Sequence, residues 1–112
     1  MKDDISHWDV SSVTNMNAMF RIWSNPKQIN LSGWDTSRVE KMWWTFSHSN
    51  FNDESILGWD VSSVTNAHKT FENAWIFNHN LSRWDFADGV DCSGINLGSK
   101  LTYQNLPPKC KV

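Results

Sequence analysis

The sequence predicts an α/β repeat protein, a solenoid of about three and a half stacked units that each contain a short strand and a short helix. The dipeptide Trp-Asp recurs at intervals of 26, 25 and 25 residues, beginning at Trp8, Trp34, Trp59 and Trp84. A phenylalanine follows each of the first three tryptophans by 12 residues, and an aliphatic residue precedes all four by three residues. Three positions therefore recur in register along the chain, which chance does not explain.

The composition agrees with one folded domain. The chain has 112 residues, of which eight are tryptophan, and Phe, Trp and Tyr make up 13% of the sequence. Disordered chains contain few aromatic residues. The net charge of -2 gives no electrostatic reason to bind nucleic acid. No apolar run approaches the roughly 20 residues of a membrane span, so we expect a soluble protein with no membrane span and no nucleic-acid partner.

Each unit is predicted to begin with a short strand. Ile5, Trp8 and Val10 have the L-x-x-L-x-L spacing of a leucine-rich repeat, which suits a turn that leads into a short strand whose alternate residues point inward. Serines follow in each of the first three units and can cap the free N–H groups at the start of a helix. Apolar residues then recur at spacings of three, four and seven residues, which predicts a short helix with one apolar face. The predicted architecture is therefore leucine-rich-repeat-like.

The repeat divides the chain into a solenoid over residues 1–86 and an irregular C-terminal cap over residues 87–112. The units lie near residues 5–30, 31–55 and 56–80, with the start of a fourth at 81–86. A solenoid needs a polar terminal cap, and the repeat pattern is lost beyond residue 86. Stacking places equivalent side chains in rows. The predicted structural core is a tryptophan row of Trp8, Trp34, Trp59 and Trp84 and a phenylalanine row of Phe20, Phe46 and Phe71.

Two cysteines, Cys92 and Cys110, lie in the predicted cap, and the sequence leaves their redox state open. As free thiols they suit a cytosolic protein. As a disulfide they would close a loop of 19 residues, a constraint that contributes about 3 kcal/mol in an oxidising compartment. The histidines and cysteines show no metal-ligand spacing, so neither a metal nor another cofactor is expected.

The aspartates of the Trp-Asp pairs form a third row, in which stacking brings the carboxylates to about 5 Å from one another. Like charges that close are unfavourable unless something compensates. We expect each carboxylate to accept hydrogen bonds from the turn that follows, at Ser11-Ser12 and its equivalents. A calcium ladder is the alternative, weakened because no second carboxylate row accompanies it. Identical environments do not separate two pKa values into an acid and a base, so no catalytic residue is assigned and no enzyme is expected.

The phrase Trp-Asp-Val-Ser-Ser-Val-Thr-Asn-Met-x-x-Met-Phe, followed by Phe-Asn-x-x-Leu-x-x-Trp, resembles a bacterial surface-protein repeat of about 25 residues. That repeat occurs in BspA-like and lipoprotein-associated proteins and is grouped with leucine-rich repeats. The phrase is carried here by residues 8–20, by residues 59–71 with Ala67 and Thr70 in place of the methionines, and by residues 77–84. The resemblance covers roughly residues 4–86. It implies an adhesive or protein-binding module at the cell surface or secreted, with no catalytic residues.

Two function classes stay open at this point. The first is the adhesion-type protein-binding module that the resemblance implies. The second is a small stand-alone intracellular inhibitor of the phage or mobile-element type, which binds one protein target. The initial Met1 and the lack of an apolar signal region favour the second class and a cytoplasmic location, provided that the chain is complete. The identity of the partner, a protein or a glycan, is open in both.

The predicted binding site lies in the second unit, where Trp43 and Trp44 occupy two rows that are small or polar in the first and third units. Adjacent residues of a helix point about 100° apart, so both rings cannot join one core stripe. We expect Trp43 to be buried and Trp44 to be exposed, with Arg38 and Lys41 nearby. Exposed Trp beside Arg is typical of binding hot spots. The alternative is that Trp44 packs sideways on a neighbouring unit.

The N-terminal face of the first unit has no predicted cap. Ile5, Trp8 and Val10 would therefore expose apolar surface of the kind that marks interfaces. This predicts possible self-association through the N-terminal face.

Overall fold

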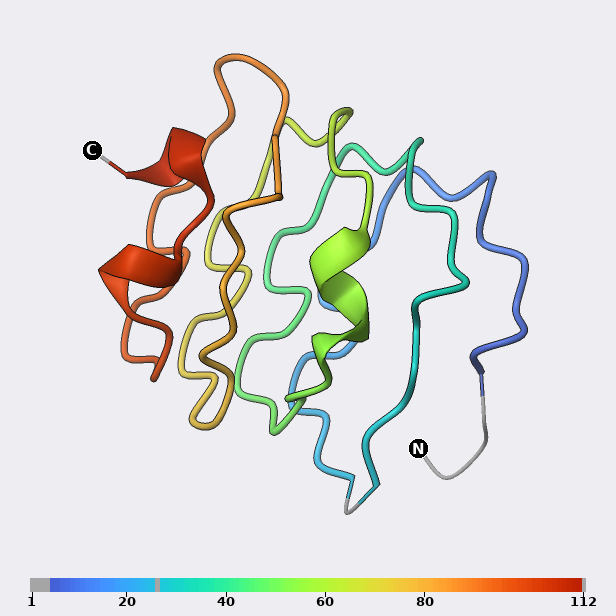
Figure 1. The fold of residues 1–112 in the computed structure, drawn as a ribbon, viewed down its shortest axis with the longest axis horizontal. Coiled ribbons are helices and arrows are strands. Elements are labelled where there is room, and N and C mark those ends of the chain that lie inside the picture. Colours follow the sequence, from blue (N-terminus) through green and yellow to red (C-terminus); the bar gives the residue numbers. More distant parts are fainter. Residues whose placement is uncertain (1–4, 26, 112) are drawn as a thin grey trace.

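The structure is a computed structural model, which describes residues 5–25 and 27–111. Within these residues, regular structure is limited to three short 3-10 helices: η1 (Glu54–Gly58), η2 (Tyr103–Asn105) and η3 (Pro108–Cys110). The rest of the described chain winds in successive coils that lie side by side from the N-terminal to the C-terminal end (Figure 1). We number these coils as the sequence units: the first spans residues 5–30, the second 31–55 and the third 56–80, and the fourth begins at residue 81.

Neighbouring coils are joined by a ladder of backbone hydrogen bonds between residues about 25 positions apart. The N–H groups of Met42, Trp44, Phe46 and His48 donate to the carbonyls of Asn66, His68, Thr70 and Glu72, over 2.8–3.1 Å. The same pattern links the first coil to the second and the third to the fourth. Parallel bridges join Asn15 to Lys41, Lys41 to Asn66, and Asn66 to Asp91. Beyond the bridges, each coil donates N–H groups to the coil that follows it. At the bridges the direction is reversed, and the N–H groups of Lys41, Asn66 and Asp91 donate to the carbonyls of Thr14, Glu40 and Thr65 in the preceding coil.

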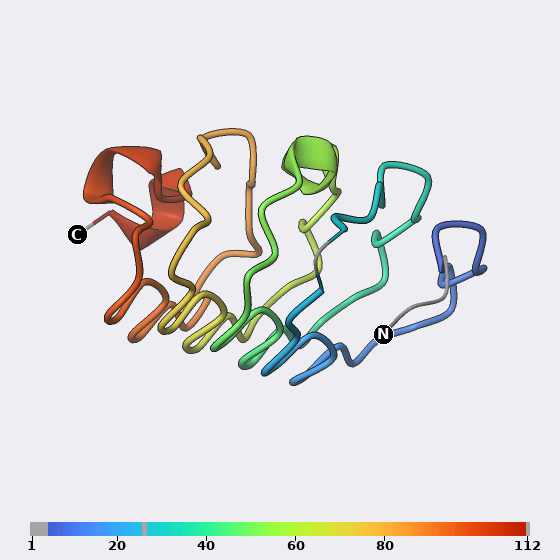
Figure 2. The same ribbon diagram turned by 90° about the horizontal axis from the view of Figure 1, so that it is seen from below.

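The predicted short helices are wrong, because the segment assigned to them turns through left-handed backbone twice in each coil. The left-handed residues, with φ between 53° and 68°, form one row of Ala18, Trp44, Lys69 and Gly94 and a second row of Ile22, His48, Asn73 and Gly98. A right-handed helix excludes such residues, which cost about 1–2 kcal/mol each when they carry a Cβ atom. The apolar spacing of three and four residues therefore arises from stacked tight turns. Figure 2 shows these turns aligned along one side of the molecule.

At Ile5–Val10 the predicted turn is present, but the short strand that was expected to follow it is wrong. The backbone there makes a turn, in which the N–H of Trp8 donates to the Ile5 carbonyl over 3.0 Å. The parallel bridges lie further along each coil, at Asn15 and its equivalents. The extended pairing thus occurs where the sequence predicted the start of the helix.

We expect Ala18→Gly to stabilise the protein by about 1 kcal/mol. Ala18 is exposed and has a φ of 57°, so glycine would relieve the steric cost of its Cβ atom. The fourth coil already has glycine at the equivalent position, Gly94. Urea unfolding of the two proteins measures the difference. Ala87→Gly, outside the left-handed rows, is the matched control and should destabilise; equal losses in both variants would contradict the interpretation.

The phenylalanine row forms a stack through the core. The ring centroids of Phe20 and Phe46 lie 5.4 Å apart with nearly parallel planes, and those of Phe46 and Phe71 lie 5.3 Å apart. All three side chains are buried. Phe51 adds a further ring beside Phe46, at 4.8 Å. The predicted row therefore places the same side chain against its equivalent in each neighbouring coil.

Three tryptophans of the predicted row form a second stack. The rings of Trp34 and Trp59 lie 6.1 Å apart and those of Trp59 and Trp84 lie 6.3 Å apart, with interplanar angles of 8° and 3°. Each indole N–H donates to a backbone carbonyl of the preceding coil, and these acceptors are Ile5, Leu31 and Ile56 at 2.8–3.1 Å. The aliphatic residue three positions before each Trp thus supplies the acceptor for the next Trp.

Trp8 is not a core residue, contrary to the prediction. Its side chain is 47% exposed. The buried tryptophans are covered and hydrogen-bonded by a preceding coil, and no described residue precedes the first coil in the stack. Ile5 and Val10 are buried, so the expectation that they expose apolar surface is also wrong.

The predicted boundary at residue 86 falls too early, because the ladder continues into the fourth coil. The N–H groups of Ala67, Lys69, Phe71 and Asn73 donate to the carbonyls of Asp91, Ser93, Ile95 and Leu97. Only the chain beyond Gly98 departs from the coil pattern. This segment contains η2 and η3, and its buried residues Leu101 and Leu106 cover the end of the core.

A disulfide and the ion pairs of Lys109 attach the C-terminal segment to the fourth coil. A disulfide joins Cys92 to Cys110, with the Cα atoms 5.6 Å apart. The Lys109 ammonium pairs with the carboxylates of Asp85 at 3.0 Å and Asp88 at 3.1 Å and donates to the Phe86 carbonyl. These hydrogen bonds to Asp85 and Asp88 raise the pKa of Lys109. The C-terminal segment is therefore attached at two places on one coil.

Candidate functional site

Trp43 and Trp44 lie at a tight turn of the second coil, and their exposure is the reverse of the prediction. Trp43 is 37% exposed, whereas Trp44 is half-buried and its indole N–H is buried without an acceptor among the described residues. The two ring centroids are 4.8 Å apart. The helical angle between adjacent side chains does not apply here, because Trp44 has a left-handed φ of 63°.

The cation beside Trp44 comes from the preceding coil. The guanidinium of Arg21 lies over the Trp44 ring, 4.7 Å from its centroid, in a cation–π contact. Arg38 and Lys41, the cations predicted for this place, are both exposed, and Lys41 belongs to the backbone ladder. Sequence reasoning missed Arg21 because a helix would have sent it away from Trp44. The stacking register does not reveal this contact either, because it sets Trp44 beside Ala18 and Arg21 beside Ser47.

Trp43 belongs to a row of equivalent residues, one from each coil: Asn17, Trp43, His68 and Ser93. Its ring meets the His68 ring edge to face, at 5.3 Å and 73°. A shallow pocket of about 220 Å³ lies along this row, lined by Trp43, Asn66, His68, Asp91 and Ser93. Three adjacent coils thus contribute to one surface that combines an aromatic ring with amide, imidazole, hydroxyl and carboxylate groups. We call it the Trp43 surface.

The hydrogen bonds at the Trp43 surface determine which atoms of His68 and Ser93 donate a proton. Ser93 Oγ donates to Asp91 Oδ1 over 2.7 Å, and His68 Nδ1 lies 2.5 Å from the same Oγ. A hydroxyl has one proton, so neutral His68 must carry its proton on Nδ1 and donate it to Ser93. In a catalytic triad the histidine instead accepts the serine proton. The arrangement therefore does not activate Ser93 as a nucleophile, and it leaves Nε2 of His68 as an acceptor.

The Asp91 carboxylate is held in its charged form. The Ser93 hydroxyl and then the Ser93 backbone N–H donate to it and lower its pKa. The pocket therefore contains a negative charge that can accept hydrogen bonds from a polar ligand.

The row of Trp-Asp aspartates behaves as predicted in three of its four members. Asp9, Asp35 and Asp60 each accept from the serine two residues further on, with Oγ at 2.6 Å and the backbone N at 3.0 Å, and these bonds lower the pKa of all three. The prediction is wrong for Asp85, which pairs with Lys109. In the fourth coil a serine contact of the same kind is made by Asp91, which belongs to the row of Asn15, Lys41 and Asn66. Within the described residues, no group of three His, Cys, Asp or Glu side chains is arranged to hold a metal ion.

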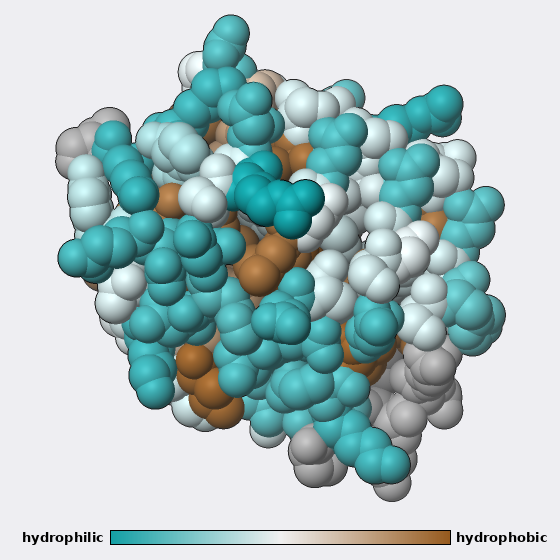
Figure 3. Space-filling model, in the orientation of Figure 1, coloured by the Kyte–Doolittle hydropathy of each residue, from teal (hydrophilic) through white to brown (hydrophobic). Residues whose placement is uncertain are grey.

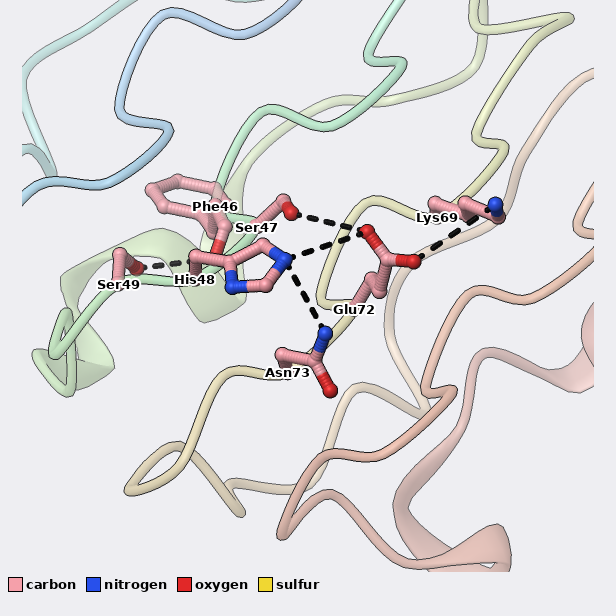
Figure 4. A network of polar contacts seen from close by, with 7 residues as sticks. All are labelled: Phe46, Ser47, His48, Ser49, Lys69, Glu72 and Asn73. Atoms are coloured by element: carbon pink, nitrogen blue, oxygen red, sulfur yellow. Dashed lines mark hydrogen bonds and ion pairs between the residues drawn. The ribbon is translucent and has the colours of Figure 1, made fainter.

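A second polar cluster, which the sequence did not predict, joins the second and third coils around Glu72 (Figure 4). Ser47 Oγ donates to Glu72 at 3.2 Å, and Lys69 and His48 approach the carboxylate at 3.7 and 3.8 Å. Asn73 Nδ2 lies 3.1 Å from His48 Nε2. His48, Lys69 and Asn73 are left-handed residues of the stacked turns. The cluster therefore has a structural explanation, since it adds contacts between coils at residues of both left-handed rows.

The family model described as "Mycoplasma protein of unknown function, DUF285" matches residues 1–107. No curated protein and no solved structure matches the chain. In the part of the chain that the structure describes, no helix is long and apolar enough to cross a membrane.

Proposed function

Since the chain belongs to the DUF285 family of Mycoplasma proteins of unknown function, we propose that it is a non-enzymatic binding module that holds a protein or glycan ligand on the Trp43 surface. One observation carries this proposal. Trp43 stays partly exposed beside a pocket of polar groups, whereas the tryptophans of the core rows in the second to fourth coils are buried. Aromatic side chains at the centre of a polar surface are typical of binding hot spots.

Neighbouring side chains hold the Trp43 ring in place, which favours ligand binding. Arg21 stacks on Trp44, and Trp44 in turn contacts Trp43. His68 holds the other side of the Trp43 ring. A side chain that is already fixed in place loses little conformational entropy when a ligand arrives. The proton arrangement of His68 and Ser93 supports a binding role over a catalytic one.

The proposal includes the architecture and the setting. The backbone ladder and the aromatic stacks support a leucine-rich-repeat-like solenoid. The resemblance to BspA-like repeats supports an adhesion-type role at a cell surface. The Cys92–Cys110 disulfide supports an oxidising compartment, where such bonds persist, and so favours this role over an intracellular inhibitor.

Trp43→Ala tests the proposal. Purified protein is applied to an array of glycans and to a panel of immobilised extracellular proteins, and the affinity for each captured probe is then measured. We expect the variant to bind at least about tenfold more weakly, as for hot-spot residues, and to keep its stability within about 1 kcal/mol of wild type.

Trp8→Ala is the matched control, because Trp8 is also an exposed tryptophan but lies in the first coil. We expect it to bind as wild type does. Equal binding by Trp43→Ala and wild type, or a surface that captures none of the probes, would refute the proposal.

A further inference from the structure

The backbone ladder ends in an open carbonyl edge on the first coil. In the second, third and fourth coils, carbonyls two residues apart accept N–H groups from the preceding coil. The equivalent carbonyls of the first coil belong to Asn15, Asn17, Met19 and Arg21, and no described residue donates to them. Edges of this kind pair readily with another chain unless they are protected.

The other end of the ladder is an open amide edge. The donor positions of the fourth coil are the N–H groups of Cys92, Gly94, Asn96 and Gly98, and they find no acceptor among the described residues. Cys92 lies beside Cys110 of the C-terminal segment, to which it is bonded. The edge from Gly94 to Gly98 continues beyond that contact.

The two edges have complementary chemistry and the same spacing. Both repeat every second residue, since both are ends of one regular ladder. In the register that joins the coils, the N–H of Gly94 would meet the carbonyl of Asn17, Asn96 would meet Met19, and Gly98 would meet Arg21. The edges lie at opposite ends of the row of turns (Figure 2). One molecule therefore cannot pair its own edges, but two molecules can.

Exposed apolar side chains flank both edges. Ile22 lies at the end of the carbonyl edge and is 69% exposed, and Leu97 lies within the amide edge and is 56% exposed. The face shown in Figure 3 is mainly hydrophilic, with small separate hydrophobic patches. Pairing of the edges would bring Leu97 next to the segment that contains Ile22 and remove both from water, which is favourable.

We propose that copies of this chain associate head to tail, with the amide edge of one copy paired in parallel with the carbonyl edge of the next. Two carbonyl edges present runs of acceptors to each other, and so a symmetric dimer through that edge gains no ladder hydrogen bonds. The contact is heterologous, and it generates open-ended assemblies or closed rings. It is limited to the turns, because Leu101 and Leu106 cover the core at the C-terminal end. Association is therefore weak and depends on concentration.

The experiment blocks each edge separately with a lysine, which protects sheet edges in natural proteins. Ile22→Lys blocks the carbonyl edge and Leu97→Lys blocks the amide edge. In sedimentation equilibrium, wild type should grow beyond a dimer as concentration rises, and each variant alone should stay monomeric. A 1:1 mixture of the two variants should form a heterodimer and nothing larger, because one intact edge of each kind remains.

Trp75→Lys, which changes an exposed side chain of the third coil, is the control and should assemble as wild type does. Monomeric wild type, a dimer of either blocked variant alone, or a mixture that does not associate would each overturn the proposal. Amide hydrogen exchange gives a readout that needs no variant. The exchange of Gly94, Asn96 and Gly98 in wild type should slow as concentration rises, and unchanged exchange would also overturn it.

Discussion

Phe46→Ala is expected to lower the free energy of unfolding by about 3–5 kcal/mol, the range for truncation of a buried aromatic residue. Phe46 is fully buried and stacks on Phe20 on one side and on Phe71 on the other. Phe51 and Trp59 also contact its ring. The cavity left by the ring would lie between coils whose backbones are held by the ladder, so it cannot easily collapse. Denaturant titration followed by tryptophan fluorescence measures the loss.

Two controls separate this effect from a general sensitivity to mutation. Phe46→Leu keeps most of the buried volume and should cost less than half as much. Trp8→Ala removes a larger side chain from an exposed position and should change stability by about 1 kcal/mol or less. Comparable losses for Phe46→Ala and Trp8→Ala would contradict the stacked core.

Removal of the Cys92–Cys110 disulfide is expected to cost about 3 kcal/mol, mainly through the entropy that the unfolded chain regains. The bond closes the loop that contains η2 and η3 and keeps the C-terminal segment over the end of the core. The double variant Cys92→Ser/Cys110→Ser should therefore unfold at lower denaturant concentration than the oxidised wild type.

The reductant response is the matched control for this prediction. Dithiothreitol should bring the wild-type midpoint down to that of the double variant and leave the double variant unchanged. Lys109, Asp85 and Asp88, which form ion pairs in the structure, are unchanged in sequence in both proteins, so a difference in midpoint reports on the disulfide. A wild-type midpoint that does not respond to complete reduction would contradict the assigned role of the bond.

The sequence predicted the core rows because burial in a repeat follows from register alone. Equivalent residues occupy equivalent positions, so the 25-residue period was enough to place Phe46 between Phe20 and Phe71 without knowledge of the backbone. The stack of described coils also has two ends, and this explains why Trp8 was wrongly predicted to be a core residue. Trp34, Trp59 and Trp84 each lie against a preceding coil, whereas no described coil precedes Trp8.

The backbone between the rows could not be obtained in the same way. Apolar spacings of three and four residues fit an amphipathic helix, and they also fit two tight turns in succession. The distinguishing signal was present at Gly94 and Gly98, which occupy the left-handed positions in the fourth coil. It was hidden because side chains as large as Trp44 and His48 occupy the same positions in the second coil.

The prediction of the binding surface was affected by the same wrong assumption of a helix. With a helix assumed, Trp44 was expected to face solvent, whereas the turn leaves Trp43 as the more exposed ring. The choice of the second unit came from its departure from the rows, and the pocket does include Trp43. The contributions of Arg21, His68 and Asp91 depend on contacts between coils, which the pattern within one unit does not contain.

The ladder also bears on how fast the protein can fold. Its hydrogen bonds and aromatic contacts join residues about 25 positions apart, and the described residues contain no α-helix that could form early. The chain must therefore close a loop the length of a whole unit before the first contact compensates the lost entropy. Two adjacent coils form the smallest nucleus, and a third then adds to a surface already made. We expect refolding on the slow timescale of β-sandwiches rather than that of helical bundles of the same length.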